Sequence, residues 1–209
     1  MKILETERLI LREIVESDGE FILDLLNQPS FIKYIGDRNV RSVDDAKDFI
    51  ENRYRASYAE HGFGLYTVEL KIQDSGFKIQ DSGFKIQDSR FKIQDSGFKI
   101  QDSGIQNPKS KIQNQQIGIC GFVKRDTLPE ADIGFAFLPQ FERKGYALEA
   151  AAAVMDYGRE TLKLGRVLAI TTIDNESSGR LLNKLGFQFE DFVKTGDEVL
   201  KLFSFDLEE

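Results

Sequence analysis

The chain has 209 residues, of which 41% are hydrophobic and 30% are charged; this length is typical of one domain, or of one domain with a large insertion, and the apolar fraction is sufficient for a core. With 28 basic and 35 acidic side chains, the formal net charge is −7. That balance argues against a nucleic-acid-binding surface, which needs clustered Lys and Arg to neutralise phosphates, and it suits a cationic partner better.

The chain begins with a predicted strand and a predicted helix. Residues 7–13 (ERLILRE) alternate between apolar and polar side chains, which is typical of a half-buried strand. Ser17, with Glu20 three residues later, has the pattern of a capping box. We therefore expect a helix over residues 21–28, which Pro29 ends because proline cannot continue a helix.

A second helix and a second strand follow. Residues 42–62 have the pattern of a helix with Ser42 as its N-cap, acidic residues in its first turn and Gly62 as its stop. His61, the only histidine, comes just before that glycine, where a basic residue is more typical of a helix end than of a catalytic base. Residues 63–71 (FGLYTVELK) then predict a strand.

Residues 71–105 consist of five near-identical copies of the heptapeptide KIQDSGF. Their apolar residues are spaced by two and then by five positions, whereas a coiled coil needs spacings of three and four. The spacing favours short extended pieces that alternate with Asp-Ser-Gly turns. Three interpretations stay open: a flexible or loosely β-like surface insertion, which we favour, a small ordered β stack, and a dedicated binding segment. The polar linker that follows extends the insertion to residues 71–116.

After the insertion, residues 117–126 (IGICGFVKRD) predict a strand that can pair with residues 63–71, so that the repeat becomes the loop of a long hairpin. Cys120, the only cysteine, lies in an apolar run, which favours an inert strand residue over a reactive thiol. A single cysteine excludes an intramolecular disulfide, and together with a single histidine it argues against a zinc site or a Ser-His-Asp hydrolase. We expect no metal.

The last part of the chain predicts a strand, a helix, a strand, a helix and two strands: residues 131–139, 146–164, 167–173, 177–186, 187–195 and 199–207. The whole chain, residues 1–209, therefore predicts a single α/β domain with a mixed sheet of about seven strands. The first residues lack the pattern of a signal peptide, and no run reaches about 18 apolar residues. We expect a cytoplasmic protein without a membrane partner.

The stretch QFERKGYALEAAAAVMDYG, residues 140–158, joins a strand to a helix and has the features of an anion-binding turn. Gly145 has no side chain to keep a phosphate away from the backbone, and the first turn of a helix offers free N–H groups and the positive end of its dipole. Arg143 and Lys144 add positive charge. By itself, this pattern fits an ordinary helix start equally well.

Three motifs together resemble the GNAT N-acetyltransferases, in particular the RimJ/RimL-like branch. Residues 142–147 (ERKGYA) are similar to the Gln/Arg-x-x-Gly-x-Gly/Ala signature that precedes the central helix of that family. Residues 175–187 (NESSGRLLNKLGF) are similar to its Asn-x-x-Ser and Lys-x-Gly-Phe segment, and residues 5–13 (ETERLILRE) to its opening strand. The resemblance covers residues 5–70 and 117–207, and it implies the GNAT fold with its strongly twisted sheet.

The resemblance implies an enzyme that moves an acetyl group from acetyl-CoA directly to an amine. The family holds the pyrophosphate with the amides of its signature turn and pairs the pantetheine arm with the preceding strand. The matching positions are Arg143, Lys144, Gly145, Tyr146 and Ala147 for the turn, and Phe137 and Leu138 for the strand. Asn175 matches the family's cofactor-side asparagine, and Ser178 matches the serine near the CoA sulfur, which would donate to the leaving thiolate. A backbone N–H near Phe137 or Leu138 would polarise the thioester oxygen.

The general base is left open among four carboxylates at the start of the signature strand and after the last helix: Glu130, Asp132, Glu190 and Asp191. We favour Asp132 as the catalytic base, because the family often places its acid on that strand. Two positions depart from the family pattern: Glu142 puts a carboxylate near the pyrophosphate, and Leu182 replaces a tyrosine that many relatives use as the thiolate acid. The second departure favours Ser178 as the donor. Glu149 is interpreted as a carboxylate that favours the helix dipole.

We therefore expect an acetyl-CoA-dependent N-acetyltransferase whose acceptor is a primary amine. The RimJ/RimL-like resemblance favours a protein N-terminal amine. A small amine, such as a polyamine or an amine antibiotic, is the alternative, and a non-catalytic CoA-binding interaction protein is a third interpretation. The sequence leaves both a monomer and a homodimer open.

Overall fold

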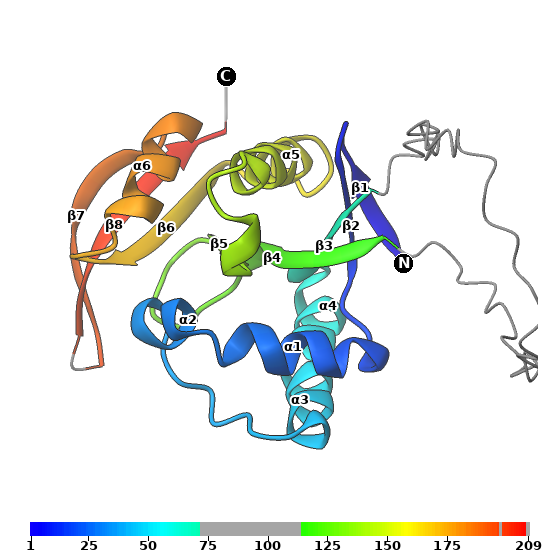
Figure 1. The fold of residues 1–209 in the computed structure, drawn as a ribbon. Coiled ribbons are helices and arrows are strands. Elements are labelled where there is room, and N and C mark those ends of the chain that lie inside the picture. Colours follow the sequence, from blue (N-terminus) through cyan, green and yellow to red (C-terminus); the bar gives the residue numbers. More distant parts are fainter. Residues whose placement is uncertain (72–113, 197, 208–209) are drawn as a thin grey trace, which may run out of the picture. The chain divides into compact units, whose positions relative to one another are not determined.

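The computed structural model describes residues 1–71, 114–196 and 198–207 (Figure 1). Met1–Lys71 and Gln115–Glu209 form one compact unit. Most of the heptapeptide repeat and of its polar linker lies outside the described residues. The three interpretations of the repeat, and a single domain over residues 1–209, therefore stay predictions.

An eight-stranded sheet has the strand order β1-β2-β3-β4-β5-β6-β8-β7. The strands are β1 Lys2–Glu5, β2 Leu9–Glu13, β3 Leu65–Leu70, β4 Gln115–Val123, β5 Asp132–Phe137, β6 Arg166–Thr172, β7 Gln188–Thr195 and β8 Glu198–Asp206. Neighbouring strands are antiparallel, except for β5 and β6, which are parallel. The predicted mixed α/β sheet is confirmed. It has one strand more than predicted, because the first residues of the chain add β1 to the edge of β2.

Helices cover both faces of the sheet (Figure 1). One face carries α1 Gly19–Leu26, α2 Pro29–Tyr34, α3 Val43–Phe49, the π-helical segment η2 Ile50–Arg55 and α4 Ala56–His61. The opposite face carries α5 Tyr146–Glu160 and α6 Glu176–Leu185. Two short 3-10 turns, η1 Glu16–Asp18 and η3 Pro139–Phe141, precede α1 and α5. Among the described residues, no helix combines the length and apolar character needed to cross a membrane.

The first helix begins differently from the prediction. Ser17 and Glu20 form no capping box at the start of α1. The buried carboxylate of Asp18 accepts a hydrogen bond from the N–H of Val15 at 2.9 Å. It also accepts hydrogen bonds from both terminal nitrogens of Arg12, at 2.7 and 2.8 Å. An ion pair with Arg12 of β2, six positions earlier, therefore organises this turn, and the helix-start pattern of the sequence does not reveal it.

Pro29 begins a helix instead of only ending one. It occupies the first position of α2, where a missing N–H costs nothing, and this short helix was not predicted. The long helical segment after it has the predicted ends: Ser42 Oγ accepts the N–H of Asp45 at 3.1 Å, and Gly62 stops the segment with a φ of 77°. Its middle turn is π-helical, and the 3.6-residue pattern used to predict it does not distinguish this geometry.

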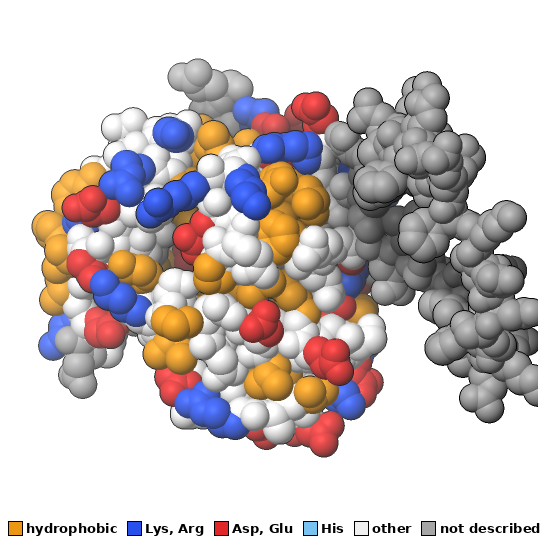
Figure 2. Space-filling view, in the orientation of Figure 1, with side chains coloured by type: hydrophobic (Ala, Val, Ile, Leu, Met, Phe, Trp, Pro, Cys, Tyr) orange, Lys and Arg blue, Asp and Glu red, His pale blue; other side chains and the backbone are white. Residues whose placement is uncertain are grey.

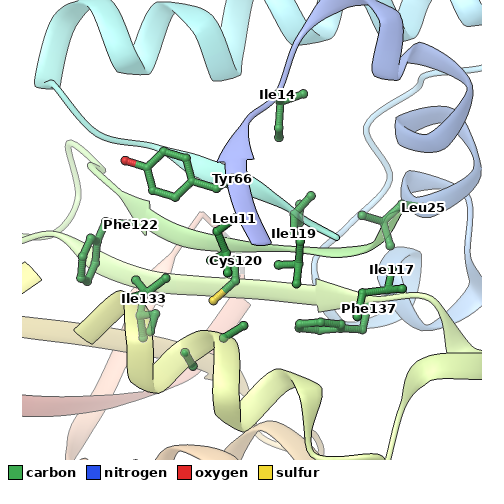
Figure 3. Packing of buried hydrophobic residues seen from close by; sticks show 14 of the residues in the cluster. Leu11, Ile14, Leu25, Tyr66, Ile117, Ile119, Cys120, Phe122, Ile133 and Phe137 are labelled. Carbon is green, nitrogen blue, oxygen red and sulfur yellow. The ribbon is translucent and has the colours of Figure 1, made fainter. Parts of the chain in front are cut away.

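Apolar side chains of the sheet and of the flanking helices form a continuous core (Figure 3). Leu11, Tyr66, Ile119 and Phe122 bring side chains from three neighbouring strands into it. Cys120 is fully buried in β4, and burial raises the pKa of its thiol above the usual range. The prediction of a strand position is therefore confirmed, and both features support an inert thiol.

The predicted pairing of β3 with β4 is also confirmed, and it yields a test of the insertion. The register runs from Leu65 opposite Gly121 to Leu70 opposite Gln115, so the two strand ends stand side by side. We expect that replacing residues 72–113 with Asn-Gly, which suits a two-residue hairpin turn, preserves the fold. The melting temperature should stay within about 4 °C and the Kd for CoA within about threefold, measured by calorimetry. An insoluble product would show that the repeat supports the fold.

Candidate active site

The parallel strands β5 and β6 part soon after they begin. Their register holds one Cα pair, Asp132 with Leu168, next to a hydrogen bond from the Leu168 N–H to the Ala131 carbonyl at 3.0 Å. Both strands run in the same direction, so their carboxyl ends lie at the same edge of the sheet, with a gap between them. Ligands of α/β sheets bind outside the carboxyl ends of parallel strands, which makes this gap the candidate site.

The backbone of β5 presents hydrogen-bonding groups to that gap. Along a strand, successive residues direct their N–H and carbonyl groups to alternate neighbours. The Ala131 carbonyl faces β6, whereas the Leu138 N–H faces β4 and donates to the Ile117 carbonyl at 2.9 Å. It follows that Phe135 and Phe137 direct their backbone groups toward β6, where pairing has ended. Of the two predicted strand positions, Phe137 therefore has an N–H on the gap, while the N–H of Leu138 is already bonded.

The turn before α5 leaves a run of backbone donors free. In the part of the chain that the structure describes, the N–H groups from Arg143 to Leu148 have no acceptor, and Glu149 is the first to bond, to the Gly145 carbonyl at 3.1 Å. Arg143 and Gly145 have positive φ angles of 59° and 83°, and left-handed residues in such turns point successive N–H groups into one concavity. Basic side chains gather on the surface over the start of α5 (Figure 2). The turn thus has the geometry of an anion cradle.

The β1–β2 turn holds this cradle in place through Glu149. The Glu149 carboxylate accepts the hydroxyl of Thr6 at 2.6 Å, the N–H of Arg8 at 3.0 Å and the Nε–H of Arg8 at 2.6 Å. Arg8 also donates Nη1–H to the Lys144 carbonyl at 3.2 Å and lies over the Tyr146 ring. One arginine therefore contacts the turn, the first residue of α5 and the carboxylate one turn later.

Glu149 is more than the dipole-favouring carboxylate that the sequence indicated. Burial alone would raise its pKa, but the hydrogen bonds from Thr6 and Arg8 hold the pKa below its usual value. Sequence reasoning missed these contacts because Glu149 and Arg8 are 141 positions apart. A signal was present, since Arg8 lies within the stretch similar to the family's opening strand.

Asn175 and Ser178 lie at the start of α6, directly after β6. The side-chain oxygen of Asn175 accepts the N–H of Ser178 at 3.1 Å, which is an N-cap. The Asn175 NH₂ group and the Ser178 hydroxyl donate to no other described residue, so both stay available to a ligand. Helix α6 packs against α5 on the same face of the sheet (Figure 1). The cradle after β5 and these two side chains after β6 therefore share one edge of the sheet.

Asp132, the favoured base, lies at the closed end of the gap. Its buried carboxylate accepts the Nε–H of Arg125 at 2.8 Å. Burial raises the pKa of Asp132, although Arg125 opposes the shift. Five residue steps of about 3.3 Å place it roughly 17 Å from Phe137 along β5. Its catalytic role stays a prediction, and this position argues against contact with an acetyl group near Phe137.

Two of the other sequence candidates for the base, Glu130 and Glu190, also lie away from the open end. Glu130 lines a pocket of about 790 Å³ beside Gly165 and Arg166, at the start of β6. Glu190 accepts a bond from Arg166 at 2.6 Å, which places it at that same end. Asp191 is exposed on the edge strand β7. The described residues contain no group of His, Cys, Asp and Glu that could hold a metal ion.

Comparison with known proteins identifies the family. The profile described as "Acetyltransferase (GNAT) domain" matches residues 8–188. An N-acetyltransferase of Bacillus subtilis, YoaA, is 30% identical over 193 residues, which cover 92% of this chain and 86% of the relative. The chain therefore belongs to the GNAT acetyltransferase family. It has the GNAT fold and the acetyl-transfer activity of that family, whose members use acetyl-CoA.

Solved structures share the fold at low sequence identity. A RimL ribosomal L7/L12 alpha-N-protein acetyltransferase in complex with CoA superposes with a TM-score of 0.69 at 14% identity, covering 99% of this chain and 98% of the other. A spermidine N-acetyltransferase from Vibrio cholerae, in complex with CoA and spermine, superposes with a TM-score of 0.64 at 15% identity, covering 97% of both chains. At these identities, both likenesses show the shared fold alone.

The cradle fits the diphosphate of CoA by the geometry of this chain alone. Its N–H groups are unpartnered in the described residues, and Gly145 adopts a left-handed conformation that other residues rarely adopt. A Cβ at Gly145 would lie 3.3 Å from Nη2 of Arg8, in the narrow space between the turn and the arginine. Backbone donors at a helix N-terminus bind phosphate groups well.

The contacts of Glu149 predict a loss of CoA affinity when they are removed. We expect Glu149→Gln and Arg8→Gln each to raise the Kd for CoA about tenfold, or about 1.4 kcal/mol, because the turn loses its support. The double variant should bind CoA little worse than either single variant, since both changes break one interaction. Asp156→Asn, which removes an exposed partner of Arg159 on the same helix, is the control. If calorimetry gives the Glu149 and Arg8 variants the same Kd for CoA as the control, these two residues do not position the turn.

Proposed function

We propose that this acetyltransferase acts on a protein N-terminal amine. The observation that supports the site is the run of free N–H groups at a left-handed turn, next to the strand edge that β6 leaves open. The acceptor class rests on the motifs shared with the RimJ/RimL-like branch and on the fold-level likeness to RimL.

In this proposal, the cofactor side of the site is built almost entirely from backbone. The N–H groups of Arg143, Lys144, Gly145, Tyr146 and Ala147 bind the pyrophosphate. The outward backbone groups of Phe135 and Phe137 bond the amides of the pantetheine arm, as a further strand would. Glu142 is exposed, so water and salt screen its repulsion from the phosphates.

Acetyl-CoA supplies an acetyl group that is activated as a thioester. The amine nitrogen bonds to the carbonyl carbon, the carbon–sulfur bond breaks, and the proton that the nitrogen loses passes through water to the thiolate. The Phe137 N–H donates to the thioester oxygen, where negative charge develops as the amine attacks. The Ser178 hydroxyl donates to the departing sulfur, and Asn175 holds that serine in place by capping α6. These donors stabilise charge only as the reaction proceeds, which is the requirement for a faster chemical step.

A small amine is the second candidate acceptor. The formal charge of −7 suits a cationic small molecule, and the fold is shared with a spermidine N-acetyltransferase. A panel of peptides with free or blocked N-termini, together with a polyamine, separates the candidates by the rate of thiol release from acetyl-CoA. We expect transfer to free peptide N-termini and none to blocked ones. Transfer only to the polyamine would reverse the assignment, and CoA binding without thiol release would identify a non-catalytic protein.

Gly145→Asp should abolish CoA binding. The aspartate brings a negative charge into the cradle, and its Cβ meets Arg8 in a backbone conformation that costs about 1–2 kcal/mol for an L-residue. Gly62→Asp is the matched control, because Gly62 has a φ of 77° and nothing lies within 4 Å of the position that a Cβ would take there. Calorimetry should show that only the Gly145 variant loses CoA. If Gly145→Asp retains its affinity for CoA, the pyrophosphate binds at another place.

Ser178→Ala should lower kcat about 100-fold and change the KM for acetyl-CoA less than threefold, because the lost bond forms mainly as the thiolate departs. Ser177→Ala, one residue earlier and exposed, should leave both constants unchanged. Unaltered turnover in the Ser178→Ala variant would remove Ser178 from the mechanism.

Asp132→Asn serves as a comparison. We expect this change to destabilise the fold by breaking a buried ion pair, while kcat stays within about threefold.

A further inference from the structure

Lys33 of α2 holds its ammonium group in a small site made by two other residues. Its Nζ lies 2.9 Å from Oδ2 of Asp174, 3.1 Å from the hydroxyl of Tyr34 and 4.5 Å from the centroid of the Tyr34 ring. A carboxylate, a hydroxyl and an aromatic face together are the groups that bind a primary ammonium. The site therefore has the chemistry of an ammonium receptor, with a side chain of the same protein bound to it.

Asp174 stands at the open end of the gap between β5 and β6. It follows β6 and directly precedes Asn175, the residue that caps α6. Its second oxygen, Oδ1, accepts the hydroxyl of Thr172 at 2.9 Å, which orients the carboxylate. The ion pair joins α2, on one face of the sheet, to the loop that starts α6, on the opposite face (Figure 1). The ammonium thus lies on the α2 side of the proposed reaction site, away from the face that carries the cradle.

Stability does not account for this arrangement. The side chains of Lys33 and Asp174 are 58% and 59% exposed, and exposed ion pairs add little to stability because water screens their charges. The contacts raise the pKa of Lys33, through its bond to Asp174, and lower the pKa of Asp174, through its bond to Lys33. Both groups therefore stay charged near neutral pH, and an exposed ammonium can be exchanged for another at small cost.

Apolar side chains flank the ammonium site in the sequence. Ile32 and Ile35 of α2, and Ile173 before Asp174, expose 39%, 40% and 52% of their surface. Figure 2 shows apolar side chains over α2 with acidic and basic side chains beside them. Exposed aliphatic surface next to a carboxylate suits an alkyl chain that ends in an ammonium group.

We propose that Asp174 and Tyr34 bind a second ammonium group of the acceptor, and that Lys33 occupies this site until the acceptor displaces it. This inference rests on the proposed acetyl transfer and specifies the acceptor further. One amino group of the acceptor reacts as the free amine beside Ser178, while the other stays protonated at Asp174. An acceptor with only one amino group leaves Lys33 in place and gains nothing from the site.

The first test measures binding without turnover. CoA-saturated protein is titrated calorimetrically with 1,4-diaminobutane and with butylamine. Lys33→Met should bind the diamine about fivefold more tightly than the wild type, because the diamine no longer has to displace the Lys33 ammonium from Asp174. Asp174→Asn should weaken diamine binding at least about fivefold, and neither variant should change butylamine binding.

Two control variants separate a specific site from general electrostatics. Glu176→Gln removes the same charge from a neighbouring position, where Glu176 pairs with Arg180. Lys47→Met removes an exposed lysine that pairs with Asp44. The proposal is overturned if Glu176→Gln weakens diamine binding as much as Asp174→Asn, if Lys33→Met does not tighten it, or if no variant distinguishes the diamine from butylamine.

The second test measures turnover with the same variants. Asp174→Asn should raise the KM for 1,4-diaminobutane and leave the KM for butylamine unchanged. Lys33→Met should lower the KM for 1,4-diaminobutane and also leave the KM for butylamine unchanged. A peptide with Lys at its second position, compared with one that has Ala there, shows whether a peptide can supply the second ammonium. Failure of acetyl transfer to every amine would contradict the proposed function, whereas transfer whose diamine preference ignores Asp174 would contradict this inference alone.

Discussion

The parting of β5 and β6 is the constraint on which the rest of the site depends. Pairing between these parallel strands is limited to the region of Asp132 and Leu168, and a strand edge without a partner needs another hydrogen-bonding group. Phe135 and Phe137 therefore direct free backbone groups to a gap that an extended ligand can fill. Because parallel strands end at the same edge, the turn after β5 and the cap after β6 come to the same place.

The anion cradle depends on contacts from the other end of the chain. A left-handed residue such as Arg143 is strained, and free N–H groups repel one another when they point into one concavity. Arg8 and Glu149 hold the turn in this conformation by joining the β1–β2 turn to the Lys144 carbonyl and to the first turn of α5. The short β1 strand, which has little core of its own, thereby contributes to the site by fixing the position of Arg8.

The two faces of the sheet contribute different kinds of groups to the site. The face with α5 and α6 carries backbone donors, which suit the phosphates and amides that every molecule of CoA shares. The face with α2 meets the same edge through charged and apolar side chains, including Lys33 and its partner Asp174. Side chains change more readily than backbone geometry, so acceptor choice can differ among proteins that share one cofactor cradle.

Local pattern in the sequence was sufficient for the α/β class, for most strands, for the ends set by Ser42 and Gly62, and for the turn around Gly145, because these features depend on residues close together in the chain. The family motifs also selected Asn175 and Ser178. Only the tertiary structure decided that Asp18 organises the first helix, that Asp132 lies at the closed end of the gap, and that Glu149 binds Arg8. Asp18 and Glu149 depend on charged partners in other elements of the fold, and the place of Asp132 depends on the register between β5 and β6. Periodicity and spacing carry no record of contacts between separate elements.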